Sequence, residues 1–247
     1  MSTEKTDAIV IRLADFSESS RVVTFFTRDF GKVAVLAKGA KRLKGAFEAA
    51  LDLLTACRIV FIRKTNASLG ILTEAQLVQR FRPDRSQLAA LYGGYYVAEL
   101  LDSLTQEFDA HPQLFDDSFL TIEELTGEQP ASLTIARFEL TILREIGELP
   151  ELSRCIVCDN EITESESVSY WAAQSGVLCH RCRRDEYSRF RLHGSTLSFL
   201  RELSNPSAPG KSLQPTRQQL AEIRHVLSPA ISHILGRQPR TLKYLQL

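Results

Sequence analysis

The segment RVVTFFTRDFGKVAVLA, residues 21–37, decides the fold of the first third of the chain. Residues 21–27 and 32–37 are rich in β-branched and aromatic side chains, which favour strands. Between them, Asp29-Phe30-Gly31 carries the residue types that turns prefer. The segment therefore predicts two strands joined by a turn.

Similar strand signals continue on both sides of this segment. Residues 8–13 and 57–63 form further β-rich runs, and residues 69–73 and 75–78 can join into one long strand. Five short strands with turns between them predict a small barrel or sandwich. A five-stranded barrel of this size, over residues 1–82, matches an oligonucleotide-binding (OB) fold.

The pattern changes at Pro83, where the apolar period becomes helical. Apolar residues step by three and four from Leu88 to Leu101, as on the buried face of a helix. Further helices are predicted over residues 111–125, 133–146, 197–203, 218–227 and 231–235, with Gly147 as a cap and Pro229 between the last two. The predicted fold class is α+β, with an OB-fold β-barrel over residues 1–82, an α-helical domain over 83–150 and 193–247, and an inserted four-cysteine zinc module over 151–192.

The segment CIVCDNEITESESVSYWAAQSGVLCHRC, residues 155–182, contains four of the five cysteines. Two Cys-x-x-Cys pairs separated by twenty residues are typical of a tetrahedral zinc site, so we predict Zn²⁺ bound by Cys155, Cys158, Cys179 and Cys182. Four thiolates leave no open position for water, which favours a structural ion. The alternatives are a redox-active pair, unmetallated thiols, or His180 in place of one cysteine.

Charge is segregated along a chain whose net charge is zero. Residues 1–82 carry a net charge of +6 and residues 193–247 carry +5, whereas residues 83–150 carry −10 and residues 151–192 carry −1. This asymmetry suggests a polyanionic partner for the basic ends, although acidic solvated faces are also common on helical bundles.

A basic segment follows the third predicted strand. It is rich in cations and glycines, which suits contacts with phosphates along a nucleic-acid strand. Phe47 is the better candidate for stacking on a base, because Phe25 and Phe61 are more simply core residues. A solvated loop without a ligand remains the alternative. The predicted nucleic-acid-binding residues are Lys38, Lys41, Arg42, Lys44, Phe47, Arg58, Arg63 and Lys64.

Motifs for catalysis are missing from the sequence. There is no phosphate-binding GxxxxGK[ST], no GxGxxG, no GxSxG and no HExxH, and we expect no enzyme activity. No run of about 18–20 apolar residues predicts a membrane span. The amino terminus lacks the apolar core of a secretory signal, so we expect a cytoplasmic protein.

Several segments together resemble the RecO family of bacterial DNA-repair and recombination-mediator proteins. The resemblance rests on residues 18–33, 37–42, 72–77 and 95–102, on 137–140 and 147–152 before the cysteines, and on the tail LGRQPRTLK at 235–243. The order of these motifs matches that of the family, and the resemblance covers nearly the whole chain.

The resemblance implies an OB domain, a helical domain and, in members with the cysteines, a zinc module. It implies binding of single- and double-stranded DNA and annealing of complementary strands in the cytoplasm, in association with the nucleoid. It also implies partnership with RecR, contact with the acidic tail of single-strand-binding protein, and loading of RecA. The candidate partner-binding residues are Arg137, Arg237, Arg240 and Lys243, with an intrahelical ion pair as the alternative for Arg137.

Two other classes of function stay open at this point. An OB barrel with a zinc module also suits an RNA-binding or ribosome-associated protein, because cations and stacking rings accept either nucleic acid. A zinc-dependent enzyme would need a metal with an open coordination position, which four thiolates do not provide.

Overall fold

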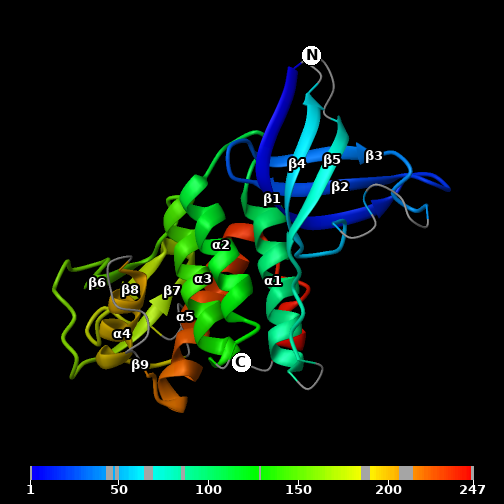
Figure 1. The fold of residues 1–247 in the computed structure, drawn as a ribbon. Coiled ribbons are helices and arrows are strands. Elements are labelled where there is room, and N and C mark those ends of the chain that lie inside the picture. The colour runs from blue at the N-terminus through cyan, green and yellow to red at the C-terminus, as the bar shows by residue number, and fades with distance from the viewer. Residues whose placement is uncertain are drawn as a thin grey trace. The chain divides into compact units, whose positions relative to one another are not determined.

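The computed structural model describes residues 2–42, 47, 50–63, 69–84, 87–127, 129–184, 190–205 and 214–245. The chain divides into two compact units, Met1–Gln129 and Pro130–Leu247, which we call the barrel unit and the C-terminal unit. Figure 1 shows the barrel strands in blue and cyan and the helices and smaller sheet that follow.

Five strands close into a barrel in the order β1-β2-β3-β5-β4. Their bounds are β1 (Ser2–Asp15), β2 (Arg21–Thr27), β3 (Gly31–Ala37), β4 (Ala56–Arg63) and β5 (Gly70–Gln79). The pair β3–β5 is parallel, while β1–β2, β2–β3, β1–β4 and β4–β5 are antiparallel. The predicted OB barrel is thus confirmed, and residues 70–79 form a single strand.

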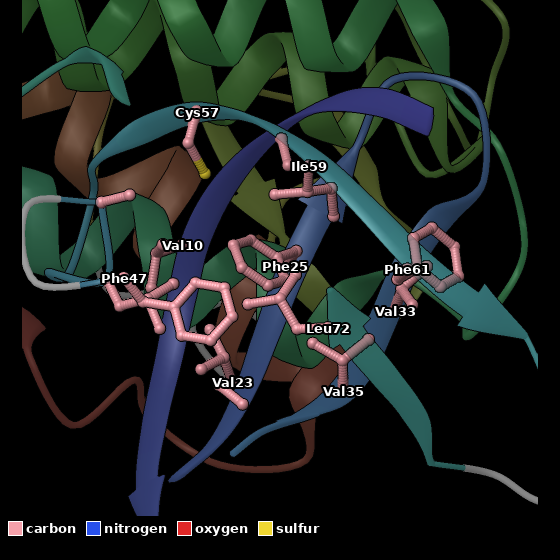
Figure 2. Packing of buried hydrophobic residues seen from close by; sticks show 14 residues of the cluster. Val10, Val23, Phe25, Val33, Val35, Phe47, Cys57, Ile59, Phe61 and Leu72 are labelled. Atoms are coloured by element: carbon pink, nitrogen blue, oxygen red, sulfur yellow. The ribbon is translucent and has the colours of Figure 1, made fainter. Parts of the chain in front are cut away.

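Alternating side chains of these strands fill the barrel. On β3, every second residue from Gly31 to Ala37 is buried, so Val33 and Val35 point inward. Phe25 and Phe61 are fully buried in the same cluster, as expected for core residues. Figure 2 shows these side chains gathered inside the barrel. Burial of one face of each strand fixes the register of the sheet.

Gly31 occupies a position that other residues would not tolerate. Its φ is +63°, in the left-handed region that favours glycine, and a Cβ there would stand 1.8 Å from the backbone oxygen of Asp109. The turn between β2 and β3 therefore depends on this residue.

Two helices complete the barrel unit, α1 (Leu88–Leu104) and α2 (Pro112–Glu124), close to their predicted ranges. Both contact the barrel through ion pairs. The Arg28 guanidinium donates to both oxygens of Asp116 on α2 at 2.9 Å. The Lys32 ammonium lies 3.8 Å from the Asp102 carboxylate on α1. Part of the acidic helical segment therefore pairs with cations of the barrel while remaining partly exposed to solvent.

The C-terminal unit contains α3 (Ala131–Glu145), α4 (Gly194–Ser204) and α5 (Arg217–Leu235). Gly147 follows α3 with a φ of +77°, which confirms the predicted glycine cap. Glu139 of α3 is fully buried and its carboxylate is bound by the Arg224 guanidinium of α5. The pairing satisfies a charge that would otherwise be costly to bury.

The prediction of two helices around Pro229 is wrong. Helix α5 runs unbroken from Arg217 to Leu235 with Pro229 inside it. A proline removes one backbone hydrogen bond and crowds the preceding turn. Buried residues on both sides of it, Val226, Leu227, Ala230 and Ile231, hold the two halves of the helix on one packed face.

Residues between α3 and α4 form a second, four-stranded sheet in the order β6-β8-β7-β9. Its strands are β6 (Glu151–Cys155), β7 (Ser167–Trp171), β8 (Gly176–Leu178) and β9 (Leu192–His193), and the chain also has short 3₁₀ turns η1 (Ala172–Gln174) and η2 (Leu242–Tyr244). The three-part domain division stays a prediction. In the described part of the chain, no helix combines the length and hydropathy of a membrane span.

Candidate metal centre and candidate nucleic-acid interface

The four predicted zinc ligands lie together in the C-terminal unit. The Sγ atoms of Cys155, Cys158, Cys179 and Cys182 all lie within 4.8 Å of one another. Those of Cys158 and Cys179 are 3.7 Å apart. Four sulfurs bound tetrahedrally to one zinc ion at about 2.3 Å would be separated by about 3.8 Å. The cluster is therefore positioned to hold a metal ion.

Each Cys-x-x-Cys pair lies on a tight turn. The Asp159 N–H donates to the Cys155 carbonyl at 2.8 Å, and Asp159 has a φ of +56°. In the second pair, the N–H groups of Cys182 and Arg183 donate to the Cys179 carbonyl at 3.1 and 3.0 Å. Turns of this kind direct two thiols toward one point, which is why the spacing alone predicted the site.

The thiols differ in acidity because their hydrogen bonds differ. Burial raises the pKa of the Cys155 thiol, but hydrogen bonds from neighbouring backbone groups outweigh it and lower the pKa to about 6. The hydrogen bond with Cys158, followed by burial, raises the pKa of Cys182 to about 12. Four adjacent thiolates repel one another, so a bound cation is needed to hold all four in the charged form.

His180 is not part of this cluster, which consists of cysteines. Its Nδ1 atom lies 3.9 Å from the Glu166 carboxylate. The alternative in which His180 replaces a cysteine therefore gains no support from the geometry.

Residues 38–42, which we call the basic loop, follow β3 in the barrel unit. The Arg42 N–H donates to the Gly39 carbonyl at 3.0 Å, which closes a turn. The Lys41 N–H donates to the Ser19 carbonyl at 3.1 Å, which ties the loop to the connection between β1 and β2. Lys38 and Arg42 are exposed. The backbone thus presents these cations from a fixed turn.

A hollow of about 410 Å³ lies beside the basic loop. We call it the loop hollow, and it is lined by Asp15, Arg21, Ala40, Lys41, Arg42, Phe47 and Leu51. Three of these residues are cationic and one is acidic. A concave surface with more cations than carboxylates on an OB barrel suits a sugar–phosphate chain.

Arg21 belongs to the loop hollow, although the sequence pattern did not select it. It begins β2 and pairs with Ala37, the residue that precedes the basic loop. Its Nε atom lies 3.2 Å from the Asp15 carboxylate, which also binds Lys41. If the two predicted strands of the hairpin are paired, the start of the first strand lies beside the end of the second. This pairing would have identified Arg21 as a neighbour of the basic loop.

The predicted cations of β4 lie elsewhere. Arg58 is 2.9 Å from the Asp7 carboxylate and, with Arg28, lines a different hollow of about 380 Å³. The Arg63 guanidinium lies 4.1 Å from the ring centroid of Phe108. Neither residue lines the loop hollow. Two further predicted residues, Lys44 and Lys64, lie outside the described residues.

The structure argues against the predicted stacking role of Phe47. Its side chain is only 6% exposed and belongs to the hydrophobic core of the barrel. Figure 2 places its ring near Val10 and Val23. Phe47 forms part of the floor of the loop hollow, but its burial leaves no free face for a base. Phe47 follows the basic segment in the sequence, but its ring is not on the surface.

The predicted partner-binding cations lie in the C-terminal unit. Arg237, Arg240 and Lys243 follow α5 and are exposed, and the Lys243 ammonium lies 4.8 Å from the ring centroid of Tyr244. Arg137 is half-buried on α3. Their role in binding a partner stays a prediction.

Both parts of the sequence match families of known proteins. Residues 1–81 match the family described as Recombination protein O N terminal, and residues 85–243 match Recombination protein O C terminal. The second match alone covers more than half of the chain.

Relatives that bear the name DNA repair protein RecO match along most of the chain. The protein from Rhodopirellula baltica is 35% identical, over 96% of this chain and 97% of its own length. That from Halalkalibacterium halodurans is 32% identical, over 80% of this chain and 76% of its own. The relative from Roseiflexus sp. is 29% identical, over 98% of this chain and 84% of its own. With a closed OB barrel, a helical region and these matches at both ends, the chain belongs to the recombination protein O (RecO) family.

Proposed function

We propose that the chain is a DNA-repair and recombination mediator that acts by binding, without catalysing a reaction. It binds single- and double-stranded DNA and anneals complementary strands. With RecR, it helps to load RecA onto DNA coated with single-strand-binding protein. Membership of the RecO family carries this proposal, and the cations around the loop hollow supply a physical basis for its first step.

The basic loop and Arg21 neutralise phosphates on the bound strand. Each neutralised phosphate releases condensed counterions, so the affinity should fall steeply as salt rises. Two strands whose phosphates are partly neutralised repel each other less, which favours annealing. Arg28, Arg58 and Lys32 contribute less to this contact, because they do not line the loop hollow.

Zinc is the metal that we propose for the cysteine cluster. An all-thiolate set is one that zinc accepts readily, and it leaves no coordination site for a reacting water. The chain's own residues support the segment around it, since the Arg201 guanidinium of α4 donates to the carbonyls of Leu152 and Ile162 at 3.2 and 3.3 Å. The ion braces the fold of this segment.

Partner binding falls to the C-terminal unit in this proposal. The exposed cations Arg237, Arg240 and Lys243, together with Arg137, would bind the acidic tail of single-strand-binding protein through charge complementarity.

A strand-annealing assay with the purified, zinc-loaded chain tests the proposal. Two complementary labelled oligonucleotides are mixed with and without single-strand-binding protein, and pairing is followed by fluorescence transfer. We expect the chain to accelerate pairing in both conditions. A chain that accelerates neither reaction, or that binds RNA of the same sequence in preference to DNA, would overturn the proposal.

A further inference from the structure

A second cationic hollow lies on the C-terminal unit, beside the cysteine cluster. It has a volume of about 470 Å³. We call it the arginine hollow, and its lining residues are Ser167, His180, Arg183, Arg184 and Arg191. No part of the proposed function uses these residues.

The cysteine cluster holds one wall of the arginine hollow. His180 lies inside the turn that joins Cys179 to Cys182, and Arg183 follows it directly. The Arg183 N–H donates to the Cys179 carbonyl at 3.0 Å, so the backbone of this wall is part of the metal-binding turn. A metal bound to the thiols would therefore also fix the positions of His180 and Arg183.

Strand β9 (Leu192–His193) directly follows Arg191, another lining residue. It pairs with β7 through Val168–Leu192 and Ser167–His193. Val168 and Leu192 are buried, so their side chains anchor the strand in the hydrophobic core. Arg191 lies one residue before Leu192.

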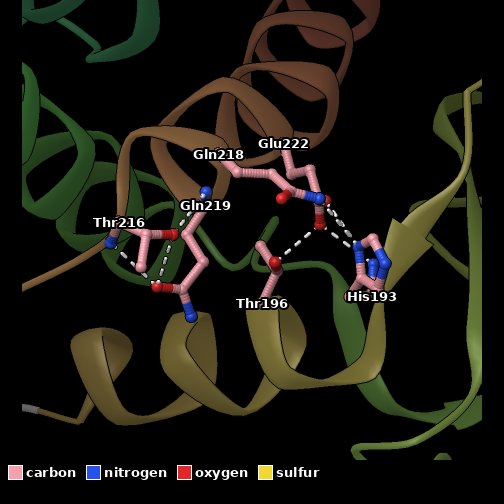
Figure 3. Close-up of polar contacts among 6 residues, drawn as sticks. All are labelled: His193, Thr196, Thr216, Gln218, Gln219 and Glu222. Atoms are coloured by element: carbon pink, nitrogen blue, oxygen red, sulfur yellow. Dashed lines mark hydrogen bonds and ion pairs between the residues drawn. The ribbon is translucent and has the colours of Figure 1, made fainter.

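A buried carboxylate ties β9 to α5. Glu222 accepts hydrogen bonds from the backbone N–H of His193 at 2.9 Å and from its Nδ1 at 2.7 Å. It accepts others from Thr196 Oγ1 at 2.6 Å and Gln218 Nε2 at 3.0 Å, as Figure 3 shows. Burial alone would raise the pKa of Glu222, but these hydrogen bonds outweigh it and lower the pKa. The charged carboxylate thus fixes His193 of β9, two residues after Arg191.

The arginine hollow differs from the hollows of the barrel unit in its charge. Those described above, and a third beside Lys32, are each lined by at least one carboxylate. Among the residues that the structure describes, the lining of the arginine hollow contains none. The carboxylate of Glu166 lies 3.9 Å from His180 Nδ1 and offsets part of the charge. Three guanidinium groups around one concavity still favour an anion.

The chemistry of the lining favours phosphate over an acidic peptide. Guanidinium groups bind phosphate through paired hydrogen bonds. A serine hydroxyl can add a further donor to a phosphate oxygen. Among the described residues, no aliphatic side chain and no Phe, Tyr or Trp lines the hollow, so these residues offer no pocket for the apolar residues that usually anchor a peptide.

We propose that the arginine hollow is a second nucleic-acid contact, in which Arg184, Arg191 and Arg183 bind backbone phosphates of a DNA strand. This inference rests on the proposed function and deepens it, because the metal-bound segment then both folds the C-terminal unit and binds DNA. Contacts to phosphates carry no sequence information, so the site adds affinity without base preference.

The test compares two variants that lose the same charge. Arg184→Gln/Arg191→Gln removes two exposed cations of the hollow, whereas Arg181→Gln/Arg217→Gln removes two exposed cations that do not line it. Zinc content and thermal unfolding are measured first for both. Binding to a labelled thymidine oligonucleotide is then measured by fluorescence anisotropy over a range of salt concentrations. A competition with poly-glutamate follows.

Each phosphate contact to a single strand contributes about 0.7 to the salt slope, or about 5-fold in affinity at 0.1 M salt. We expect the first variant to lose about 25-fold in affinity and about 1.4 in slope, and the second to change little. Equal affinities for the two folded variants would overturn this inference. So would a loss confined to poly-glutamate binding. If the unaltered chain binds no DNA, the proposed function itself fails, which is a separate result.

Discussion

The Lys41 ammonium lies 2.9 Å from the carboxylate of Asp15, at the edge of the loop hollow. That hydrogen bond is the main cause of the lowered pKa of Asp15, and Arg21 lowers the pKa further. Asp15 therefore stays charged at neutral pH and masks two of the cations that we assign to DNA. The Asp15 carboxylate therefore competes with DNA phosphates for Lys41 and Arg21.

Replacing this competitor should tighten DNA binding. In Asp15→Asn, Lys41 and Arg21 would be free to neutralise phosphates, so the affinity for single-stranded DNA should rise several-fold and the salt slope should steepen by about one phosphate contact. Anisotropy titrations measure both quantities. Glu74→Gln serves as the control, because it removes an exposed charge of the same sign from β5, away from the loop hollow. Equal gains in the two variants would contradict a local role for Asp15.

Phe47 should matter for stability and not for DNA. Removing a buried phenyl ring leaves a cavity in the barrel, so Phe47→Ala should lower the free energy of unfolding by about 3–5 kcal/mol. Phe47→Leu keeps most of the apolar volume and should bind DNA with unchanged affinity. Urea unfolding and anisotropy give the two readings. A folded Phe47→Leu variant with a large loss of affinity would instead support the stacking role.

Acid should release the metal. Each thiol must lose a proton before it can bind zinc, and the pKa of Cys182 is raised to about 12 when no cation is bound. Protons therefore compete more strongly as the pH falls, and zinc affinity should fall with it. Titration with a colorimetric chelator between pH 8 and pH 5 measures this dependence.

Removal of the metal should act locally. In hydrogen exchange, chelated protein should lose protection over residues 151–193, while the barrel strands, which contribute no ligand to the cluster, should keep theirs. An unchanged exchange pattern after chelation would show that the cysteine cluster does not brace the fold.

Removing one partner of the ion pair between Glu139 and Arg224 should strongly destabilise the C-terminal unit. In Arg224→Met, the fully buried Glu139 loses this partner, so the free energy of unfolding should fall by about 3–5 kcal/mol. Neutralising the acid as well, in Glu139→Gln/Arg224→Met, should restore much of the loss. Chemical unfolding of the two variants checks this order, and equal stabilities would contradict it.

The hairpin at residues 21–37 could be predicted because local signals agree there. Strand formers, a turn glycine and alternating burial all favour the same pairing. Residues 2–6 could not be assigned in this way, because Ser2 to Thr6 are mostly polar. They join β1 through backbone pairing with residues 59–63 of β4, which is a property of the closed barrel.

The metal centre was predictable from sequence for a related reason. Two short turns fix the positions of the thiols within each pair, so spacing alone identifies the ligands. Glu139 shows the opposite case. Its partner Arg224 lies 85 residues away in the chain, and only the packing of α3 against α5 brings the two together. Charge patterns along one helix could suggest near neighbours but not this contact.

The surface residues were the hardest to predict. Two residues were misassigned. Phe47 was expected at the surface but is buried, and Arg21 was overlooked but lines the loop hollow. The arginine hollow combines residues from the second cysteine turn with Ser167 of β7 and with Arg191, which directly precedes β9. Strands this short carry too little pattern to be recognised in the sequence.

The most direct test of the central claim is the salt dependence of single-stranded DNA binding after removal of the basic loop's charges. Lys38→Ala/Lys41→Ala/Arg42→Ala is compared with Lys5→Ala/Arg82→Ala/Arg217→Ala, which removes three exposed cations outside the loop hollow. Because Asp15 already masks Lys41, we predict that the first variant loses about 25-fold in affinity at 0.1 M salt and about 1.4 in slope, while the second changes little. A folded first variant with the affinity and slope of the unaltered chain would contradict the account.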